Sequence, residues 1–260
     1  NWAAQTDKEP EKYYFSSYFQ IVFPQNMSKT LRAKGTERVF EHARKSTISD
    51  ISGSKALDIG CGGGIFTFEL HKLNFKKICA FDISKKMIAN MGREMKRRKT
   101  ANVDLISGNI ENLPFCDNTF EFIVGVGLME CLHNQDKALK EVYRVLKPGG
   151  AAAIRWLNDE GLWGKIEYLK RSLGLPSGPF SSNFSKIDEV KLKLGQIGFK
   201  IVKIRGMIIL PLFIFPFPIS TALESLLIRT RLAYKIEGMK NAEDSSIKRW
   251  YYSFCTEIRK

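Results

Sequence analysis

The sequence has neither paired cysteines nor a cluster of histidines. Its 5 cysteines are scattered without a CxxC pair, and its 3 histidines do not lie near cysteines at the spacing of metal ligands. The lack of a CxxC pair and of a Cys/His cluster argues against a structural zinc site and favours reduced thiols, so we expect no metal. The polar first residues also lack the apolar segment of a signal peptide, which predicts a cytoplasmic location.

Long hydrophobic runs are missing as well. No apolar run reaches the ~20 residues that a membrane-spanning helix needs. The nearest candidate, residues 206–220, has no charged residue but is shorter and contains three prolines. This run is either an apolar lid on the domain itself or a surface for a membrane or a lipid-like acceptor. Contact with a membrane surface therefore stays open as a hypothesis.

Acidic residues are scarce relative to basic ones. The 27 Asp and Glu face 41 Lys and Arg, a net charge of +14 at pH 7. Such an excess favours anionic partners such as nucleic acid, a membrane surface or an acidic substrate, although a soluble lysine-rich protein explains it equally well. The densest basic run, residues 85–99, contains one acidic residue and is typical of a solvated helix face.

From about residue 55 the chain alternates short apolar runs with longer amphipathic ones. This alternation predicts βαβ units and a parallel sheet in an α/β fold. The expected strands are 55–59, 77–81, 103–106, 120–124, 151–156, 199–205 and 250–258, and the expected helices are 64–73, 85–98, 135–146 and 186–196.

The expected domain organisation also includes an N-terminal segment before the first strand and two insertions in the α/β domain. We expect an N-terminal helical cap or lid at residues 1–50 and one α/β domain at 51–260. Insertions are expected at 157–185, which is rich in Gly, Ser and Pro, and at 206–248, which contains the apolar run.

A glycine cluster directly follows the first expected strand, in the sequence DIGCGGG at residues 58–64. Bare backbone lets a ligand approach closely, and the helix that follows offers free N–H groups. Asp82 ends the second strand, where a carboxylate can accept hydrogen bonds from both hydroxyls of a ribose. The pattern predicts a nucleoside-containing ligand, and the alternatives are a purely structural turn and a helix-capping aspartate.

Two other nucleotide motifs are excluded. The dinucleotide fingerprint needs Gly or Ala five residues after its first glycine, and Ile65 stands there. A Walker loop needs a Gly-Lys-Ser/Thr sequence, which does not follow.

Four segments in order resemble the class I S-adenosylmethionine (SAM)-dependent methyltransferases: ALDIGCGGG, AFDIS, SGNIENLPFCDNTFEFIV and EVYRVLKPGG. They are most similar to the small-molecule branch that includes the ubiquinone and menaquinone methyltransferases. The resemblance covers residues 55–156 well. It implies a doubly wound, Rossmann-like sheet of seven strands, mostly parallel with an antiparallel last strand. It also implies SAM as cofactor, S-adenosylhomocysteine as product and no metal.

The resemblance further implies a role for individual residues. The glycine turn would lie under the methionine part of SAM, and Asp82 would hold the ribose. Asn109 stands where the family usually has an acidic residue, and its amide oxygen can accept the same hydrogen bond from the adenine amino group. The expected cofactor-binding residues are Asp58, Gly60, Cys61, Gly62, Asp82, Ile83, Asn109, Ile110, Gly125 and Val126.

Methyl transfer from a sulfonium needs alignment and exclusion of water, and a general base only if the acceptor must lose a proton early. Glu130 and His133, after the fourth strand, are the candidate bases, although a packing or capping role explains each of them as well. In the cap, Tyr14 and Tyr18 can share a helix face and close over SAM, or simply pack on the sheet edge. Arg32 can reach the SAM carboxylate, or be an ordinary solvated arginine.

The sequence therefore predicts transfer of a methyl group from SAM to a small-molecule or lipid-linked acceptor by in-line displacement. The basic charge keeps an RNA methyltransferase as an alternative, but no appended RNA-binding module and no Asn/Asp-Pro-Pro-Tyr tetrapeptide is recognised. A non-catalytic SAM-binding scaffold is a further alternative, which the intact glycines and Asp82 oppose.

Overall fold

The structure is a computed structural model that describes residues 53–174, 184–207 and 253–260. Outside this description lie the expected cap at 1–50 with Tyr14, Tyr18 and Arg32, and residues 208–248 of the second expected insertion.

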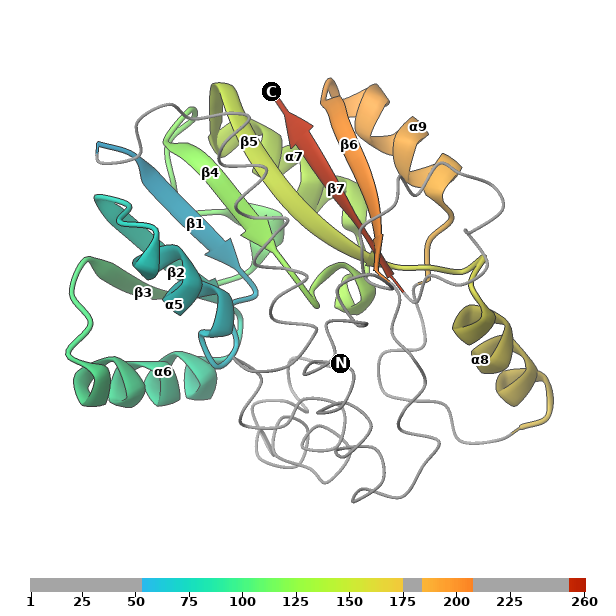
Figure 1. Ribbon diagram of the computed structural model, residues 1–260, viewed down its shortest axis with the longest axis horizontal. Helices are drawn as coiled ribbons and strands as arrows, with labels where there is room; N and C mark the ends of the chain where they lie inside the picture. Colours follow the sequence, from blue (N-terminus) through green and yellow to red (C-terminus); the bar gives the residue numbers. More distant parts are fainter. Residues whose placement is uncertain (1–52, 175–183, 208–252) are drawn as a thin grey trace, which may run out of the picture.

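The described strands form one seven-stranded sheet (Figure 1). Its order is β3-β2-β1-β4-β5-β7-β6; the first five strands are parallel, and β7 is antiparallel to both of its neighbours. This confirms the predicted doubly wound sheet with an antiparallel last strand. The strands are β1 Lys55–Ile59, β2 Lys77–Asp82, β3 Val103–Ser107, β4 Phe120–Gly125, β5 Leu146–Leu157, β6 Lys200–Met207 and β7 Ser253–Arg259.

Helices cover both faces of the sheet, because α5, α6, α7 and α9 each bury apolar side chains. The α-helices are α5 Ile65–Lys72, α6 Lys85–Arg98, α7 Gln135–Val145, α8 Leu162–Ser172 and α9 Ile187–Ile197, and the short 3₁₀ helices are η2 Ile110–Asn112 and η3 Met129–Cys131. Among the described helices, none combines the length and the hydropathy that crossing a bilayer requires.

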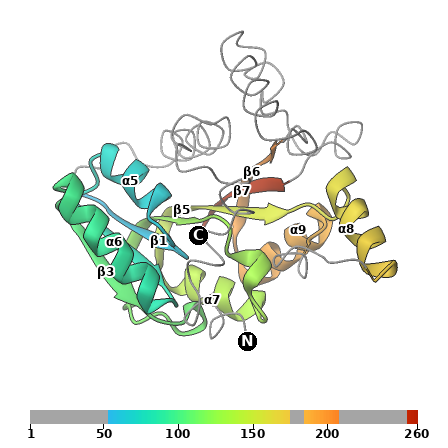
Figure 2. The same ribbon diagram turned by 90° about the horizontal axis from the view of Figure 1, so that it is seen from below.

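Two apolar layers hold the helices to the sheet. On one face, α7 and α9 pack in a single cluster with Leu57 and Ile154. On the opposite face, α5 packs through Leu70 against Ile78, and α6 packs through Met91. Figure 2 shows α5 on one side of the sheet and α7 and α9 on the other. Both layers are needed because a parallel sheet buries both faces.

The structure extends the expectations in two places. β5 begins at Leu146, well before residue 151, because Leu146 pairs with Phe120 and the backbone of Gly149 and Gly150 bonds to Lys260. The sequence Lys-Pro-Gly-Gly therefore ends a helix and also opens a strand. Inside the first expected insertion, residues 157–185, the chain forms the helix α8.

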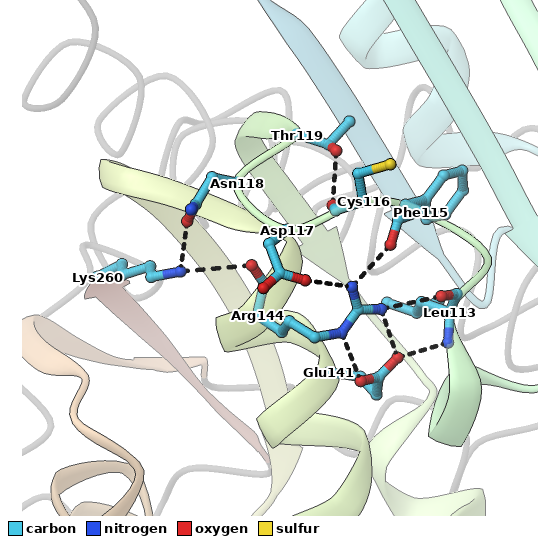
Figure 3. A network of polar contacts seen from close by, with 9 residues as sticks. All are labelled: Leu113, Phe115, Cys116, Asp117, Asn118, Thr119, Glu141, Arg144 and Lys260. Atoms are coloured by element: carbon cyan, nitrogen blue, oxygen red, sulfur yellow. Dashed lines mark hydrogen bonds and ion pairs between the residues drawn. The ribbon is translucent and has the colours of Figure 1, made fainter.

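A hydrogen-bond network around Arg144 of α7 fixes the loop that leads from η2 to β4 (Figure 3). Its Nη2 donates to the carbonyl of Leu113 at 2.9 Å, and its Nη1 donates to the carbonyl of Phe115 at 2.7 Å and to Asp117 at 2.8 Å. Glu141, one turn earlier on α7, bonds both to Arg144 and to the backbone N–H of Leu113. The arginine of the EVYRVLKPGG segment thus positions the loop that follows η2 and leads into β4.

Candidate functional site

The glycine turn joins β1 to α5 at the carboxyl edge of the sheet. Gly60, Gly62 and Gly64 have φ values of 70°, 50° and 84°, in the left-handed region that favours glycine. The backbone N–H groups of Gly60 and Cys61 both donate to the carbonyl of Phe81, at 2.8 and 3.1 Å. The turn is therefore held against the end of β2 rather than projecting freely.

Asp82 lies directly beside this turn, as the sequence predicts. Its Oδ2 accepts a hydrogen bond from the N–H of Gly62 at 2.8 Å, and its Oδ1 accepts from the N–H of Ser84 at 2.9 Å. The side chain is buried. A carboxylate has about four lone-pair sites, so these two bonds alone do not saturate it.

Asp58 brings a second buried carboxylate to the turn. Its Oδ2 accepts from the hydroxyl of Thr67, on α5, at 2.5 Å. The pKa of Asp58 is raised to about 7, chiefly by burial; the hydrogen bond from Thr67 opposes this shift, and the charge of Asp82 contributes to it. Sequence reasoning missed Thr67, because a buried helix threonine has no pattern of its own.

Asp58 and Asp82 determine whether the turn favours a cationic or an anionic ligand group. An isolated phosphate loop offers free N–H groups to an anion. Here one of those N–H groups, on Gly62, already donates to Asp82, and Asp58 lies buried nearby. Negative charge at the turn favours a cationic ligand group and disfavours a pyrophosphate.

The loop after β3 lies next to Asp82. The N–H of Gly108 donates to the backbone carbonyl of Asp82 at 3.0 Å, and a side chain at Gly108 would collide with the ring of Phe81, 2.7 Å away. Asn109 follows and is exposed, while its Oδ1 accepts from the N–H of Glu111 at 3.0 Å. The assignment of Asn109 as an adenine ligand stays a prediction, and the sequence gave no sign of the tight packing of Gly108. Ile83 is half exposed and Ile110 is buried.

Gly125 and Val126 stand at the end of β4, the next strand from the turn. Gly125 is in register with Ile59 of β1 and with Ile154 of β5. A Cβ added at Gly125 would lie 3.0 Å from the side chain of Ile59, which would have to shift to accept it. The two residues therefore lie at the carboxyl edge next to the turn, where two halves of a doubly wound sheet diverge.

The two candidate bases occupy different environments. Glu130 of η3 is buried and forms an ion pair with Arg155 of β5, with 3.2 Å between Oε1 and Nη2. His133 is exposed and directly precedes Asn134, whose side chain caps α7. The sequence gave no sign of Arg155, because a contact across 25 residues leaves no local pattern.

Within the part of the chain that the structure describes, no three His, Cys, Asp or Glu side chains form a metal-binding group.

Comparison with known proteins agrees with this geometry. Residues 57–154 match the family described as "Methyltransferase domain". A demethylmenaquinone methyltransferase of Staphylococcus saprophyticus is 40% identical over 186 residues, 60% of this chain and 74% of that protein. A demethylmenaquinone methyltransferase of Geobacillus sp. (strain WCH70) is 42% identical over 101 residues, 38% of this chain. That match spans 43% of the Geobacillus protein, less than half of its length.

Solved structures share the fold. A putative sarcosine dimethylglycine methyltransferase from Galdieria sulphuraria superposes with a TM-score of 0.61 at 17% identity, covering 94% of this chain and 96% of that one. The sheet, the glycine turn and these sequence matches together define the class: the chain belongs to the class I SAM-dependent methyltransferase family. Within that family it resembles the demethylmenaquinone methyltransferases.

Proposed function

We propose that this protein transfers the methyl group of SAM to a small-molecule or lipid-linked acceptor by in-line displacement. One observation carries the proposal: the glycine turn lies against two buried carboxylates, Asp58 and Asp82. SAM has a sulfonium next to its ribose and both an ammonium and a carboxylate at the end of its methionine part, so its net positive charge complements this turn. The family to which the chain belongs supports the same cofactor.

Each residue of the expected cofactor site has a role in this proposal. Asp82 accepts hydrogen bonds from the ribose hydroxyls, while Asp58 and residues 60–62 hold the methionine part. Ile83 flanks the adenine, and Asn109 and Ile110 approach its amino group. When bound, SAM supplies a methyl group that its own sulfonium has already activated. The protein therefore has to align the acceptor and exclude water.

For the acceptor, we infer a hydroxylated aromatic ring of the quinol type, methylated on carbon. The names of the relatives support this, since two are demethylmenaquinone methyltransferases and one is a ubiquinone/menaquinone biosynthesis C-methyltransferase. A lipid-linked acceptor also fits a basic protein that can touch an anionic membrane surface. Glu130 and His133 remain the candidates for a base.

Cofactor binding tests the proposal directly. Isothermal titration of the full chain with S-adenosylhomocysteine should show binding, and a complete lack of affinity would contradict the proposal. The Asp82→Ala variant should bind about 100-fold more weakly, because it loses two hydroxyl contacts and leaves the N–H groups of Gly62 and Ser84 without their acceptor.

A matched variant controls for the loss of an aspartate as such. Asp104, on the neighbouring strand β3, is exposed and pairs with Lys77 at 2.7 Å. The Asp104→Ala variant should bind S-adenosylhomocysteine like the unaltered protein. Equal losses in the two variants would mean that Asp82 has no specific role.

A further inference from the structure

The ion pair between Glu130 and Arg155 is incomplete although it is buried. The two residues are 4% and 6% exposed and share one contact. Among the residues that the structure describes, Glu130 Oε2 and Arg155 Nε find no hydrogen-bond partner. Buried polar groups are almost always satisfied, so each such atom needs an explanation. The pair thus presents one unused acceptor and one unused donor.

The position of the pair connects it with the proposed cofactor site. Ile59, Gly125 and Ile154 lie in one row across β1, β4 and β5. Arg155 therefore stands one residue beyond that row, two strands from the glycine turn. Neighbouring strands are about 4.8 Å apart, which places β5 roughly 10 Å from β1. β4 lies between β1 and β5, so the pair and the glycine turn stand at the same carboxyl edge of the sheet with one strand between them.

Two further features link the pair to the same edge of the sheet. Gly127, just after β4, has a φ of 76°, and a Cβ added there would lie 3.7 Å from Arg155 Nη2, so bare backbone approaches the guanidinium. The pKa of the Cys131 thiol is raised by burial and then by the charge of Glu130, and Asp82 adds to the shift. Glu130 and Asp82 therefore act on one thiol.

A second buried pair has the same chemistry in a different place. Glu257 of β7 accepts from Arg205 of β6 at 2.5 Å, and Glu257 Oε2 likewise lacks a hydrogen-bond partner within the described part of the chain. In the sheet order, however, β7 is three strands and β6 four strands from β1, roughly 14 to 19 Å away. This pair is too far from the turn to contact a group that receives the methyl.

We propose that Glu130 and Arg155 bind a neutral hydroxyl group of the methyl acceptor. The hydroxyl donates to Glu130 Oε2, and its oxygen accepts from Arg155 Nε, so one group satisfies both unused atoms. The ion pair has no net charge, so neither an ammonium nor a carboxylate would gain enough from it to offset the cost of its own desolvation. A hydroxylated acceptor is thereby preferred over a charged amine or acid. This inference rests on the proposed function and specifies its acceptor.

The test uses the full chain saturated with S-adenosylhomocysteine, under anaerobic conditions. The probes are 1,4-dihydroxynaphthalene and 1,4-dimethoxynaphthalene, which differ only in whether the ring oxygens carry a hydrogen or a methyl. The unaltered protein should bind the diol about tenfold more tightly, because the ether cannot donate to Glu130. Titration calorimetry measures both affinities.

Two variants localise the effect. Glu130→Gln removes the negative charge from the side chain that accepts the hydrogen bond of the hydroxyl. Arg155→Lys keeps the positive charge but removes the Nε–H. Glu130→Gln should weaken binding of the diol about tenfold and leave binding of the ether unchanged. Arg155→Lys should weaken binding of both probes, because the ether oxygen can also accept from Nε–H. Glu257→Gln and Arg205→Lys, in the second buried pair, are the matched controls and should bind the diol within about twofold of the unaltered protein.

Binding of S-adenosylhomocysteine and thermal unfolding are measured for every variant. If the unaltered protein does not bind S-adenosylhomocysteine, the proposed function fails. If it binds S-adenosylhomocysteine but does not prefer the diol, this inference alone is overturned. The same holds if Glu257→Gln weakens binding of the diol as much as Glu130→Gln does. Should Glu130→Gln not fold, Arg155→Lys decides by the same criterion.

Discussion

Asp58 is a buried carboxylate whose ionisation should make stability depend on pH. Its folded-state pKa is about 7, whereas its ordinary value is 3.8. Between these values the folded state holds a proton that the unfolded state has lost, so the contribution of Asp58 to the free energy of unfolding falls as pH rises from about 4 to about 7. The loss amounts to about 4 kcal/mol in the ligand-free protein and is complete above that range.

The Asp58→Asn variant isolates this effect. Asparagine can still accept from the hydroxyl of Thr67 but does not titrate. Relative to the unaltered protein, the variant should therefore become progressively more stable between pH 4 and pH 7.5, as measured by urea unfolding at a series of pH values. Asp104→Asn, at an exposed site, should show no such trend. Parallel pH curves for Asp58→Asn and the unaltered protein would refute a raised pKa at Asp58.

At the scale of residues, the sequence predicted contacts that strand topology determines better than contacts that depend on side-chain packing. The approach of Asp82 to Gly62 follows from topology, because β1 and β2 end at the same edge of a parallel sheet. Thr67 and Arg155 could not be foreseen in the same way. Their partners are set by how a helix and a distant strand pack, and the sequence contains no periodic signal for that.

At the scale of elements, Arg144 should determine how firmly the loop after η2 is attached to α7. The Arg144→Ala variant leaves the carbonyls of Leu113 and Phe115 without their donor, and water can replace it only in part because the side chain is 30% exposed. We expect the free energy of unfolding to fall by about 2 kcal/mol. Urea unfolding with an unchanged m-value measures this loss.

A lysine variant tests whether the planar guanidinium is needed, and a variant of an exposed arginine serves as its control. Arg144→Lys should recover less than half of the stability, because an ammonium cannot span several fixed acceptors as a planar fork does. Arg93→Ala, on the exposed face of α6, should change stability by no more than about 0.5 kcal/mol. If Arg144→Ala were as mild as Arg93→Ala, the network would contribute nothing to stability.

The elements around the glycine turn were predicted almost residue by residue, because buried apolar runs there are bounded by clear turn and capping signals. Ser84, for example, caps α6 as its position suggests. α8 escaped prediction because glycines flank and interrupt it. Gly164 is required inside that helix, since a side chain there would lie 2.6 Å from the carbonyl of Asp159. Helix propensity alone misjudges such a segment.

At the scale of the whole molecule, the net charge of +14 predicts weak and unspecific binding of RNA rather than recognition. Electrostatic binding of this kind weakens steeply with salt through release of counterions. Fluorescence anisotropy with a labelled single-stranded RNA should detect binding at low salt and lose it near 0.2 M salt, at affinities of about 10⁻⁴ to 10⁻⁶ M or weaker. Tight binding that persists in 0.2 M salt would favour the RNA methyltransferase alternative.

The position of β7 has a consequence for synthesis on the ribosome. β7 lies between β5 and β6 although it follows both in the chain, so β6 has no partner in the described sheet until β7 has been made. The five parallel strands with the glycine turn can assemble earlier and leave the edge of β5 open in the meantime. An open edge invites pairing with another nascent chain. Chaperone dependence should therefore concentrate in the interval between emergence of β5 and emergence of β7.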